Sequence, residues 1–405
     1  MSEWKKVKLG EITSIKTGKL DSNAAVTNGE FPFFTCDPTT LRIDKWAYDT
    51  EAILLAGNNA SGNYTAKYYK GKFNAYQRTY IIETINPQIA SVRFLAYAMN
   101  QQLQLLKVMS SGSTTKFLTM KMLTQLSINL PTNEIQQNVA TILSRYDSLI
   151  ENYQKQIKLL EEAAQRLYKE WFVDLHFPGH ENTKIVDGVP EGWKKIKLID
   201  LVDVQYGFAF DGKLFNSNGE GMPILRIRNI PDGITSDYTT EEASPNYIVH
   251  DGDIVVGMDG IFHINSWNGG DAYLVQRACS FRPKEESIRG FVFQAIQEPI
   301  KYFEQTLVGA TVAHLGKKHI DSIELIVPSN KNLYIPFQKG FKQRQSLLSQ
   351  IRLLTEARDR LLPKLMSGEI AVEEGRPERP LSCQPNGNAL GMETETNNRP
   401  VGAKD

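Results

Sequence analysis

The chain has 405 residues, 41% of them apolar, and a formal net charge of zero. This length exceeds one ordinary core and favours two or three domains, while three scattered cysteines without a CxxC pair indicate neither a disulfide framework nor a structural zinc site. Because no run of about 18 apolar residues and no leader-like N-terminus is found, we expect a cytoplasmic protein with no membrane partner.

The zero net charge is an average over unlike parts. Residues 1–131 carry +6 and residues 191–328 carry −6, whereas residues 133–171 carry −1 and residues 331–364 carry +6. A neutral chain alone argues weakly against nucleic-acid binding. The basic character, however, lies in the first globular part and in the second helical stretch.

Both globular parts, residues 1–131 and 191–328, predict mixed α/β or α+β structure. Short apolar runs bounded by Gly, Asn and Asp predict strands, and helical spacing of apolar residues predicts one helix in each part. The expected strands are at 53–55, 79–82, 253–257 and 278–281, and the expected helices are at 91–103 and 290–296.

These two parts are diverged copies of one unit. WKKVKL (4–9) recurs as WKKIKL (193–198), and Gly18 then matches Gly207. Gln77-Arg78 matches Gln276-Arg277, GSTT (112–115) matches GATV (309–312), and each unit reaches an apolar strand that ends in proline, at Pro131 and Pro328. The copies therefore share a frame and differ in their loops.

A long helix is expected over residues 132–176, because its apolar residues recur in steps of four and three. Such a seam needs a partner. IKLLEEAAQRL (157–167) aligns with IRLLTEARDRL (351–361) at seven of eleven positions, so residues 329–370 supply the partner helix. The seam residues that we expect to meet are Ile150, Ile157, Leu160, Leu167, Ile351, Leu354 and Leu361.

The ends of these helices have local signals. Thr132 or Asn133 is expected to cap the first helix, FPG (177–179) to stop it, and residues 177–190 to form a connector. Pro336 suits the first turn of the second helix, and Pro363 should kink or end it before Gly368. Arg358 takes the seam position of Ala164, so it either forms an ion pair or marks an opening. The polar tail, 371–405, is expected to be disordered.

The sequence offers no clear catalytic or metal site. It lacks a phosphate-binding loop, and Asp253 and Asp259 within GDIVVGMDG (252–260) would repel phosphate, which favours a strand and turn. The closest approach to an amino-methylating signature, DPT (37–39), lacks its second proline and aromatic residue. The six histidines form no ligand pattern. We therefore expect a non-catalytic chain without a metal or cofactor of its own.

A nucleic-acid surface is better supported. Residues 58–78 interleave Lys and Arg, which bind phosphates, with Asn and Gln, which read base edges; a solvated loop over packed tyrosines is an equal alternative. The first unit's candidates are Asn58, Asn59, Tyr64, Lys67, Lys70, Lys72, Gln77, Arg78, Thr114 and Lys116. The acidic second unit offers a weaker set: Arg226, Arg228, Asn229, His263, Asn265, Gln276, Arg277, Thr311, His314 and Lys317.

Four further motifs lie at the ends of the two halves: LYKEWFVD (167–174), FPG (177–179), PEGW (190–193) and LLPKLMSGEI (361–370). Together they resemble the specificity subunit of type I restriction-modification systems, and the last motif is the most specific. The resemblance covers residues 1–370. Gln136-Gln137 stands where the family usually has Glu-Gln, and the second helix begins atypically at YIPF (334–337).

The resemblance implies two target-recognition domains in tandem, separated by two long antiparallel coiled-coil helices that act as a ruler. Each domain would recognise one half of a split double-stranded DNA site. Two methyltransferase subunits that bind S-adenosylmethionine and methylate adenine N6, and motor-nuclease subunits that use ATP and Mg, would be the partners. A coiled-coil protein scaffold, or a solitary recognition subunit without restriction partners, remains the alternative.

Overall fold

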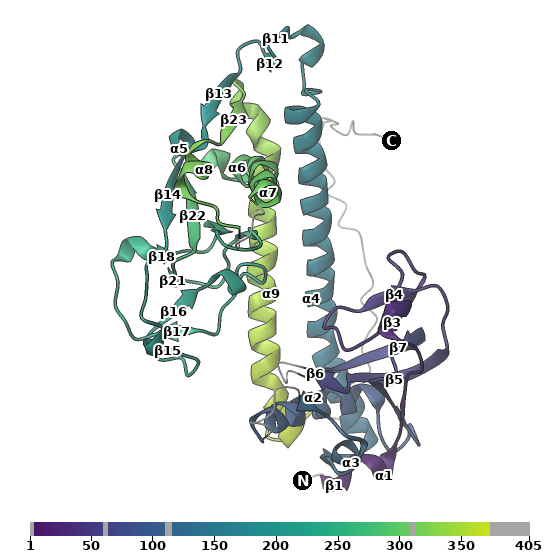
Figure 1. Ribbon diagram of the computed structural model, residues 1–405. Coiled ribbons are helices and arrows are strands. Elements are labelled where there is room, and N and C mark those ends of the chain that lie inside the picture. Colours follow the sequence, from purple (N-terminus) through teal and green to yellow (C-terminus); the bar gives the residue numbers. More distant parts are fainter. Residues whose placement is uncertain (1–3, 60–63, 110–115, 308–312, 373–405) are drawn as a thin grey trace, which may run out of the picture.

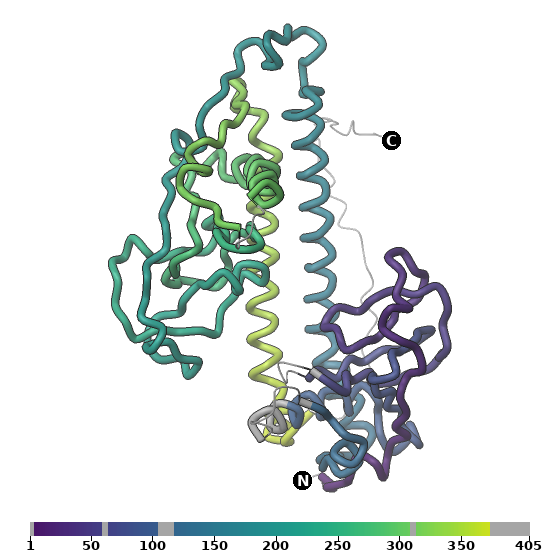
Figure 2. Tube along the Cα trace, in the orientation of Figure 1, coloured from purple at the N-terminus to yellow at the C-terminus, as the bar shows by residue number. Residues whose placement is uncertain are grey.

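The computed structural model describes residues 4–59, 64–109, 116–307 and 313–372. Two globular domains, domain 1 (4–131) and domain 2 (191–328), lie toward opposite ends of a pair of long helices and on opposite sides of it (Figure 1). The tube in Figure 2 shows the two helices running side by side with the connector at one end. The expected fold class is confirmed, while the tail beyond residue 372 lies outside the described residues.

The rod consists of α4 (Asn133–Tyr168), prolonged by a π-helical turn η2 (Lys169–Val173), and α9 (Ile335–Ser367), preceded by η8 (Lys331–Tyr334). Ile150 and Ile157 are buried between the helices, and the other expected seam residues, Leu160, Leu167, Ile351, Leu354 and Leu361, are half-buried. At about 1.5 Å per residue, α4 is about 54 Å long. The heptad pattern therefore predicted the rod correctly.

The helix ends differ in detail from expectation. Helical structure in the first helix ends at Val173, before the expected FPG stop, and Leu175 then takes a left-handed φ of 61°. The exposed Pro363 does not end α9, which continues to Ser367. Gly368, with a φ of 75°, terminates the helix. The left-handed residue after the last turn, rather than the proline, sets this terminus.

Two ion pairs join the helices across the seam. Arg358 Nη1 lies 2.7 Å from Asp147 Oδ1, and Arg344 Nε lies 2.6 Å from Glu161 Oε1. On each helix the two charged residues are two heptads apart, which is consistent with one antiparallel register along the whole contact. Arg358 thus forms an ion pair and does not open the seam.

Domain 1 is built on a six-stranded mixed sheet, in which β3 and β7 are parallel. In sheet order its strands are β2 (Thr13–Thr17), β8 (Thr79–Thr84), β5 (Tyr48–Ala56), β7 (Ala66–Ala75), β3 (Phe31–Phe34) and β4 (Leu41–Ile43). Two small sheets pair β1 (Lys5–Lys8) with β10 (Ser127–Leu130) and β6 (Asn58–Asn59) with β9 (Lys116–Phe117). Its helices are α1 (Leu9–Ile12), α2 (Val92–Met109) and α3 (Met120–Thr124).

Domain 2 divides its strands between two larger sheets. One has the order β14 (Val202–Tyr206), β22 (Ala278–Pro283), β19 (Ile254–Gly257) and β20 (Ile264–Ser266). The other has the order β15 (Phe215–Asn216), β17 (Tyr238–Thr239), β16 (Met222–Leu225), β21 (Ala272–Leu274) and β18 (Ile248–Val249). β13 (Lys194–Lys197) pairs with β23 (Glu324–Val327), and the helices are α5 (Leu198–Leu201), α6 (Arg289–Ala295), α7 (Gln297–Thr306) and α8 (Lys317–Asp321). The connector holds a short hairpin of β11 (Ile185–Val186) and β12 (Val189–Pro190).

Each domain core includes residues from both long helices. The core of domain 1 contains Val139 from the start of α4 and Leu365 from the end of α9. The core of domain 2 contains Phe337 from the start of α9 and Phe172 from η2. Because each core spans both helices, neither domain can shift along the rod without exposing apolar surface.

Equivalent glutamines anchor each helix start to its domain. Gln136 is fully buried; its Oε1 accepts from Ser91 N at 2.8 Å, and its Nε2 donates to the carbonyls of Ile89 and Pro131 at 2.9 Å. Gln338 likewise accepts from Gly290 N at 2.9 Å. A glutamate at position 136 would set a carboxylate oxygen against two carbonyls, which explains the glutamine at this position.

We expect Gln136→Ala to lower the free energy of unfolding by about 2 kcal/mol, because it leaves a buried N–H and two carbonyls without partners. Urea unfolding of the full chain, followed by circular dichroism, measures the loss. Gln137→Ala is the matched control, since Gln137 is exposed and the hydrogen bond that it donates to Asn133 is long, at 3.4 Å. Equal stability of the two variants would contradict this role for Gln136.

Candidate nucleic-acid interface

The two Gln-Arg pairs lie at equivalent positions, which we call the tips of the domains. Gln77-Arg78 links β7 to β8, and Gln276-Arg277 links β21 to β22. Gln77 N donates to Leu20 O at 2.9 Å, and Gln276 N donates to Phe208 O at 2.8 Å. All four side chains are exposed. The repeat found in the sequence is therefore a repeat in space.

A glycine fixes each tip. A Cβ at Gly18 would lie 2.1 Å from the carbonyl oxygen of Ala75, and a Cβ at Gly207 would lie 2.1 Å from that of Val275. Both distances are far below van der Waals contact. Any residue with a Cβ would therefore push away the backbone that leads into the tip, at Ala75 or Val275. The matched glycines noted in the sequence thus have a steric cause.

In domain 1, three separate segments converge at the tip. Gly57 N donates to Arg78 O at 2.7 Å and Leu118 N donates to Gly57 O at 2.9 Å, while β6 pairs with β9. Asn58 and Arg78, with the backbone of Asn59 and Lys116, are thereby brought together. Of the other candidates, Tyr64 is buried, and Thr114 and the side chains of Asn59 and Lys116 lie outside the described residues.

The same convergence occurs in domain 2, but with a carboxylate in place of Asn58. Met258 N donates to Arg277 O at 2.8 Å, and Leu315 N donates to Met258 O at 2.7 Å. Asp259 lies 2.8 Å from Arg277 Nη1 and 2.5 Å from His314 Nδ1. Sequence reasoning considered Asp259 only as a residue that repels phosphate. Aligning Met258-Asp259 on Gly57-Asn58 would have placed Asp259 at the tip. The candidate Thr311 lies outside the described residues.

Parallel strands bring one more segment to each tip. β3 runs parallel to β7, and β16 runs parallel to β21, so the residues that follow these strands emerge at the same edge. In domain 1 they include Cys36, whose thiol donates to Asn58 Oδ1 at 2.6 Å. In domain 2 they include Arg226, whose guanidinium lies 5.4 Å from the ring centre of Phe215. Cys36 was not predicted as a site residue.

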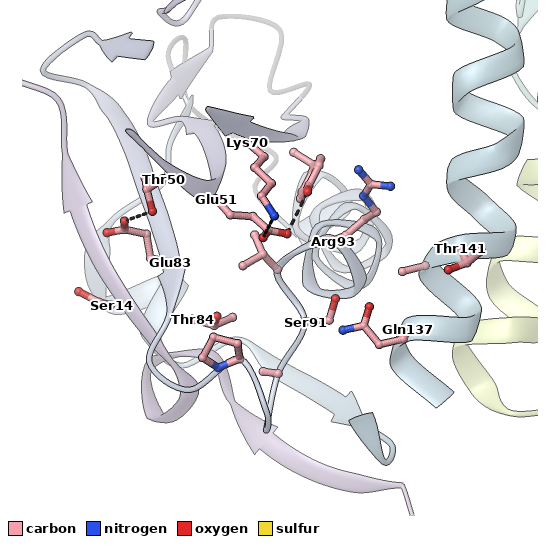
Figure 3. A pocket seen from close by; sticks show the side chains of 15 residues that line it. Ser14, Thr50, Glu51, Lys70, Glu83, Thr84, Ser91, Arg93, Gln137 and Thr141 are labelled. Atoms are coloured by element: carbon pink, nitrogen blue, oxygen red, sulfur yellow. Dashed lines mark hydrogen bonds and ion pairs between the residues drawn. The ribbon is translucent and has the colours of Figure 1, made fainter. Parts of the chain in front are cut away.

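The lysines of β7 interact with residues of their own domain. Lys67 Nζ donates to Pro38 O at 2.5 Å, and burial lowers its pKa. Lys70 Nζ lies 3.4 Å from Glu51, and Lys72 lies 4.9 Å from the ring centre of Trp46. Figure 3 shows the Lys70–Glu51 pair in a polar groove of about 620 Å³ between the sheet, α2 and α4. These three residues remain predicted contacts.

Three of the remaining candidates of domain 2 have partners. Arg228 pairs with Asp237 at 2.6 Å, and Asn229 Oδ1 accepts from Arg226 N at 3.0 Å. Asn265 donates to two carbonyls of its own domain and accepts from Arg344 of α9 at 2.8 Å. His263 is half-buried just before β20, and Lys317 is exposed at the start of α8. None of these contacts tests their role in DNA binding.

Within the described residues, no group of three or more His, Cys, Asp and Glu side chains is arranged to hold a metal ion. None of the described helices combines the length and the apolar character needed to cross a bilayer.

The family model for the type I restriction modification DNA specificity domain matches residues 1–162 and 190–351. The first match covers domain 1 and most of α4, and the second covers domain 2 and about half of α9. The chain belongs to this specificity family. Its two specificity-domain units correspond to the two halves of the repeat described above, as the resemblance of the terminal motifs predicted.

Individual relatives agree with this assignment. The chain is 32% identical to the EcoDI specificity subunit of Escherichia coli over 225 residues, which are 50% of this chain and 49% of that protein. It therefore spans about half the length of that relative. It is 23% identical to the HindI specificity subunit of Haemophilus influenzae, over 91% of this chain and the whole of that protein.

Among solved structures, the type I restriction-modification S subunit from M. genitalium shares the fold. It superposes with a TM-score of 0.56 at 19% identity, and the match covers 90% of this chain and 96% of the other. The two chains therefore share their overall fold.

The position of Cys36 beside Asn58 allows a test of the interface. We expect N-ethylmaleimide to label the half-buried Cys36 in the free protein and to label it several-fold more slowly when cognate DNA covers the tip. The thiol of Cys279 is fully buried, which raises its pKa and keeps it un-ionised and unreactive. Mass spectrometry measures both rates in a Cys383→Ser variant, which lacks the third cysteine of the chain. Equal labelling of Cys36 with and without bound DNA would contradict the interface.

Proposed function

We propose that this chain is the DNA-recognition subunit of a type I restriction-modification enzyme and that it binds a bipartite, asymmetric site in double-stranded DNA. The observation that carries the proposal is the presence of two equivalent tips on one rod whose helices enter both domain cores. Each tip presents an exposed glutamine and arginine. Arg can bind guanine and Gln can bind adenine, each through two hydrogen bonds in the major groove.

The rod makes the two weak contacts act together. Once one domain is bound, the second binds at a high effective concentration that depends on the length and stiffness of its connection. The domains differ in sequence, so the two half-sites should differ. Because the spacing between the domains is fixed, the number of base pairs between half-sites should matter as much as their sequence.

The partners and cofactors follow from the family assignment. We propose that two methyltransferase subunits, which bind S-adenosylmethionine and methylate adenine N6, and motor-nuclease subunits, which use ATP and Mg, assemble with this chain in the cytoplasm. The chain itself acts without catalysis. The rod offers exposed apolar side chains for such an assembly, including Leu149, Leu159 and Leu353, the last two 62% exposed.

A coiled-coil scaffold, or a solitary recognition subunit, is the second candidate. Domain 2 carries a negative net charge, and its cations are partly neutralised, since Arg277 pairs with Asp259 and Arg228 pairs with Asp237. Phosphate neutralisation supplies much of the affinity of DNA-binding proteins. These internal ion pairs therefore favour a scaffold role for domain 2 more than for domain 1.

Substituting each tip separately should affect one half-site at a time. We expect Gln77→Ala with Arg78→Ala to weaken binding by about 1–3 kcal/mol per lost bidentate contact and to relax discrimination in one half-site. The matched variant, Gln276→Ala with Arg277→Ala, should relax the other half-site. Competition among duplexes with one half-site scrambled measures both effects. Unchanged discrimination in the two variants would refute the tips as readers.

Salt titration separates the two candidate functions. For a recognition subunit assembled with its methyltransferase, we expect affinity for DNA to fall linearly with salt on a log–log plot, because bound phosphates release counterions. The preference for the cognate duplex should persist across the titration. A scaffold would show no sequence-selective component at any salt concentration.

A further inference from the structure

Arg344 connects both long helices to domain 2. It lies on α9 and its side chain is 9% exposed, yet all three nitrogens of the guanidinium have partners. Nε donates to Glu161 Oε1 of α4 at 2.6 Å, Nη2 donates to Asn265 Oδ1 at 2.8 Å, and Nη1 donates to the hydroxyl of Ser266. A planar guanidinium that bonds two elements at once fixes direction as well as distance.

The connection continues into a loop that carries candidate DNA contacts. Asn265 Nδ2 donates to Ile230 O at 2.9 Å and to Pro231 O at 3.1 Å. These carbonyls follow η5 (Ile227–Asn229), the turn that includes Arg228 and Asn229. A chain of hydrogen bonds therefore runs from α4 through Arg344 and Asn265 to this loop.

Two further residues of α9 hold the adjacent segment of domain 2. Ser349 Oγ donates to Asn268 Oδ1 at 3.1 Å, and Arg352 Nη1 donates to Asn268 O at 2.9 Å. Arg352 also lies 3.1 Å from Asp251. Polar residues in the middle of α9 thus hold domain 2 against the rod.

Domain 1 is held differently. Its Tyr97 hydroxyl donates to Asp147, the carboxylate that also pairs with Arg358. The side chain of Arg358 is 28% exposed, whereas that of Arg344 is 9% exposed. A buried arginine that is held by polar partners adds little net stability compared with apolar packing, and the best-attested role of such groups is to specify register and geometry.

We propose that Arg344 is a positioning residue that sets the orientation of domain 2 on the rod and thereby the number of base pairs required between the two half-sites. This inference rests on the proposed function as a DNA-recognition subunit. One additional base pair moves the second half-site by about 3.4 Å and rotates it by about 34°. A domain held by directional bonds cannot follow such a displacement, whereas a loosely held domain can.

The test uses Arg344→Lys in the full chain assembled with its methyltransferase subunits. Lys keeps the charge but lacks the planar set of donors. Binding is measured to duplexes whose half-sites are separated by the cognate spacing, one base pair fewer or one base pair more. We expect the preference for the cognate spacing to fall about tenfold, while base discrimination within each half-site is retained. Arg360→Lys is the control, because Arg360 is exposed and its ion pair with Glu356 is long, at 4.0 Å.

A second readout needs no DNA. Spin labels at the exposed positions Asn28 in domain 1 and Asn218 in domain 2 report the distribution of interdomain distances in the free chain. We expect Arg344→Lys to broaden this distribution and Arg360→Lys to leave it unchanged. Glu161→Gln keeps an acceptor for Arg344 Nε, so we expect it to broaden the distance distribution less. It replaces Arg344→Lys as the test variant if Arg344→Lys does not fold.

The outcomes are distinguishable. An unchanged distance distribution and an unchanged spacing preference in a folded Arg344→Lys variant would overturn the role of Arg344. Absence of sequence-selective binding by the wild-type complex would instead overturn the proposed function, and the distance distribution would still decide whether Arg344 orients domain 2.

Discussion

The antiparallel contact between α4 and α9 is the interaction on which the rest of the structure depends. Val139 and Leu143 at the start of α4 lie in the core of domain 1, and Phe337 and Phe341 at the start of α9 lie in the core of domain 2. Each helix then ends in the core of the opposite domain. Separation of the helices would open both cores, so the rod and the domains behave as one cooperative unit. A fixed distance between the two tips requires that the rod and both domains stay together in this way.

Periodicity and repetition predicted the features that are local in sequence. The heptad steps around Ile157 and Ile351 gave the rod, and the matched pairs Gln77-Arg78 and Gln276-Arg277 gave the two tips. The ion pairs of Asp259 were not predictable in this way, because its partners Arg277 and His314 are 18 and 55 residues away and meet it only in the folded chain. Arg344 was missed for the same reason, since nothing in its neighbourhood indicates a contact with Glu161 or Asn265.

The two domains balance their charges differently. In domain 2, carboxylates pair with its own arginines: Asp259 with Arg277, Asp237 with Arg228, and the buried Asp253 with Arg282 at 3.1 Å. In domain 1, the equivalent of Asp259 is the neutral Asn58. Two copies of one fold have therefore diverged to present tips of different charge, which supports the proposal that they recognise two unlike sequences.

The contact of Trp4 with the end of α9 closes the architecture on itself. A Cβ at Gly368 would lie 2.7 Å from Trp4 Nε1, and in the second unit Trp193 packs 5.3 Å from Phe172, between ring centres, where α4 has just ended. Each unit thus begins where the helix of the other unit finishes, and the order of elements forms a ring. The two junctions of this ring are packed alike but connected differently. The connector links α4 to domain 2 covalently, whereas α9 meets the start of domain 1 through non-covalent packing.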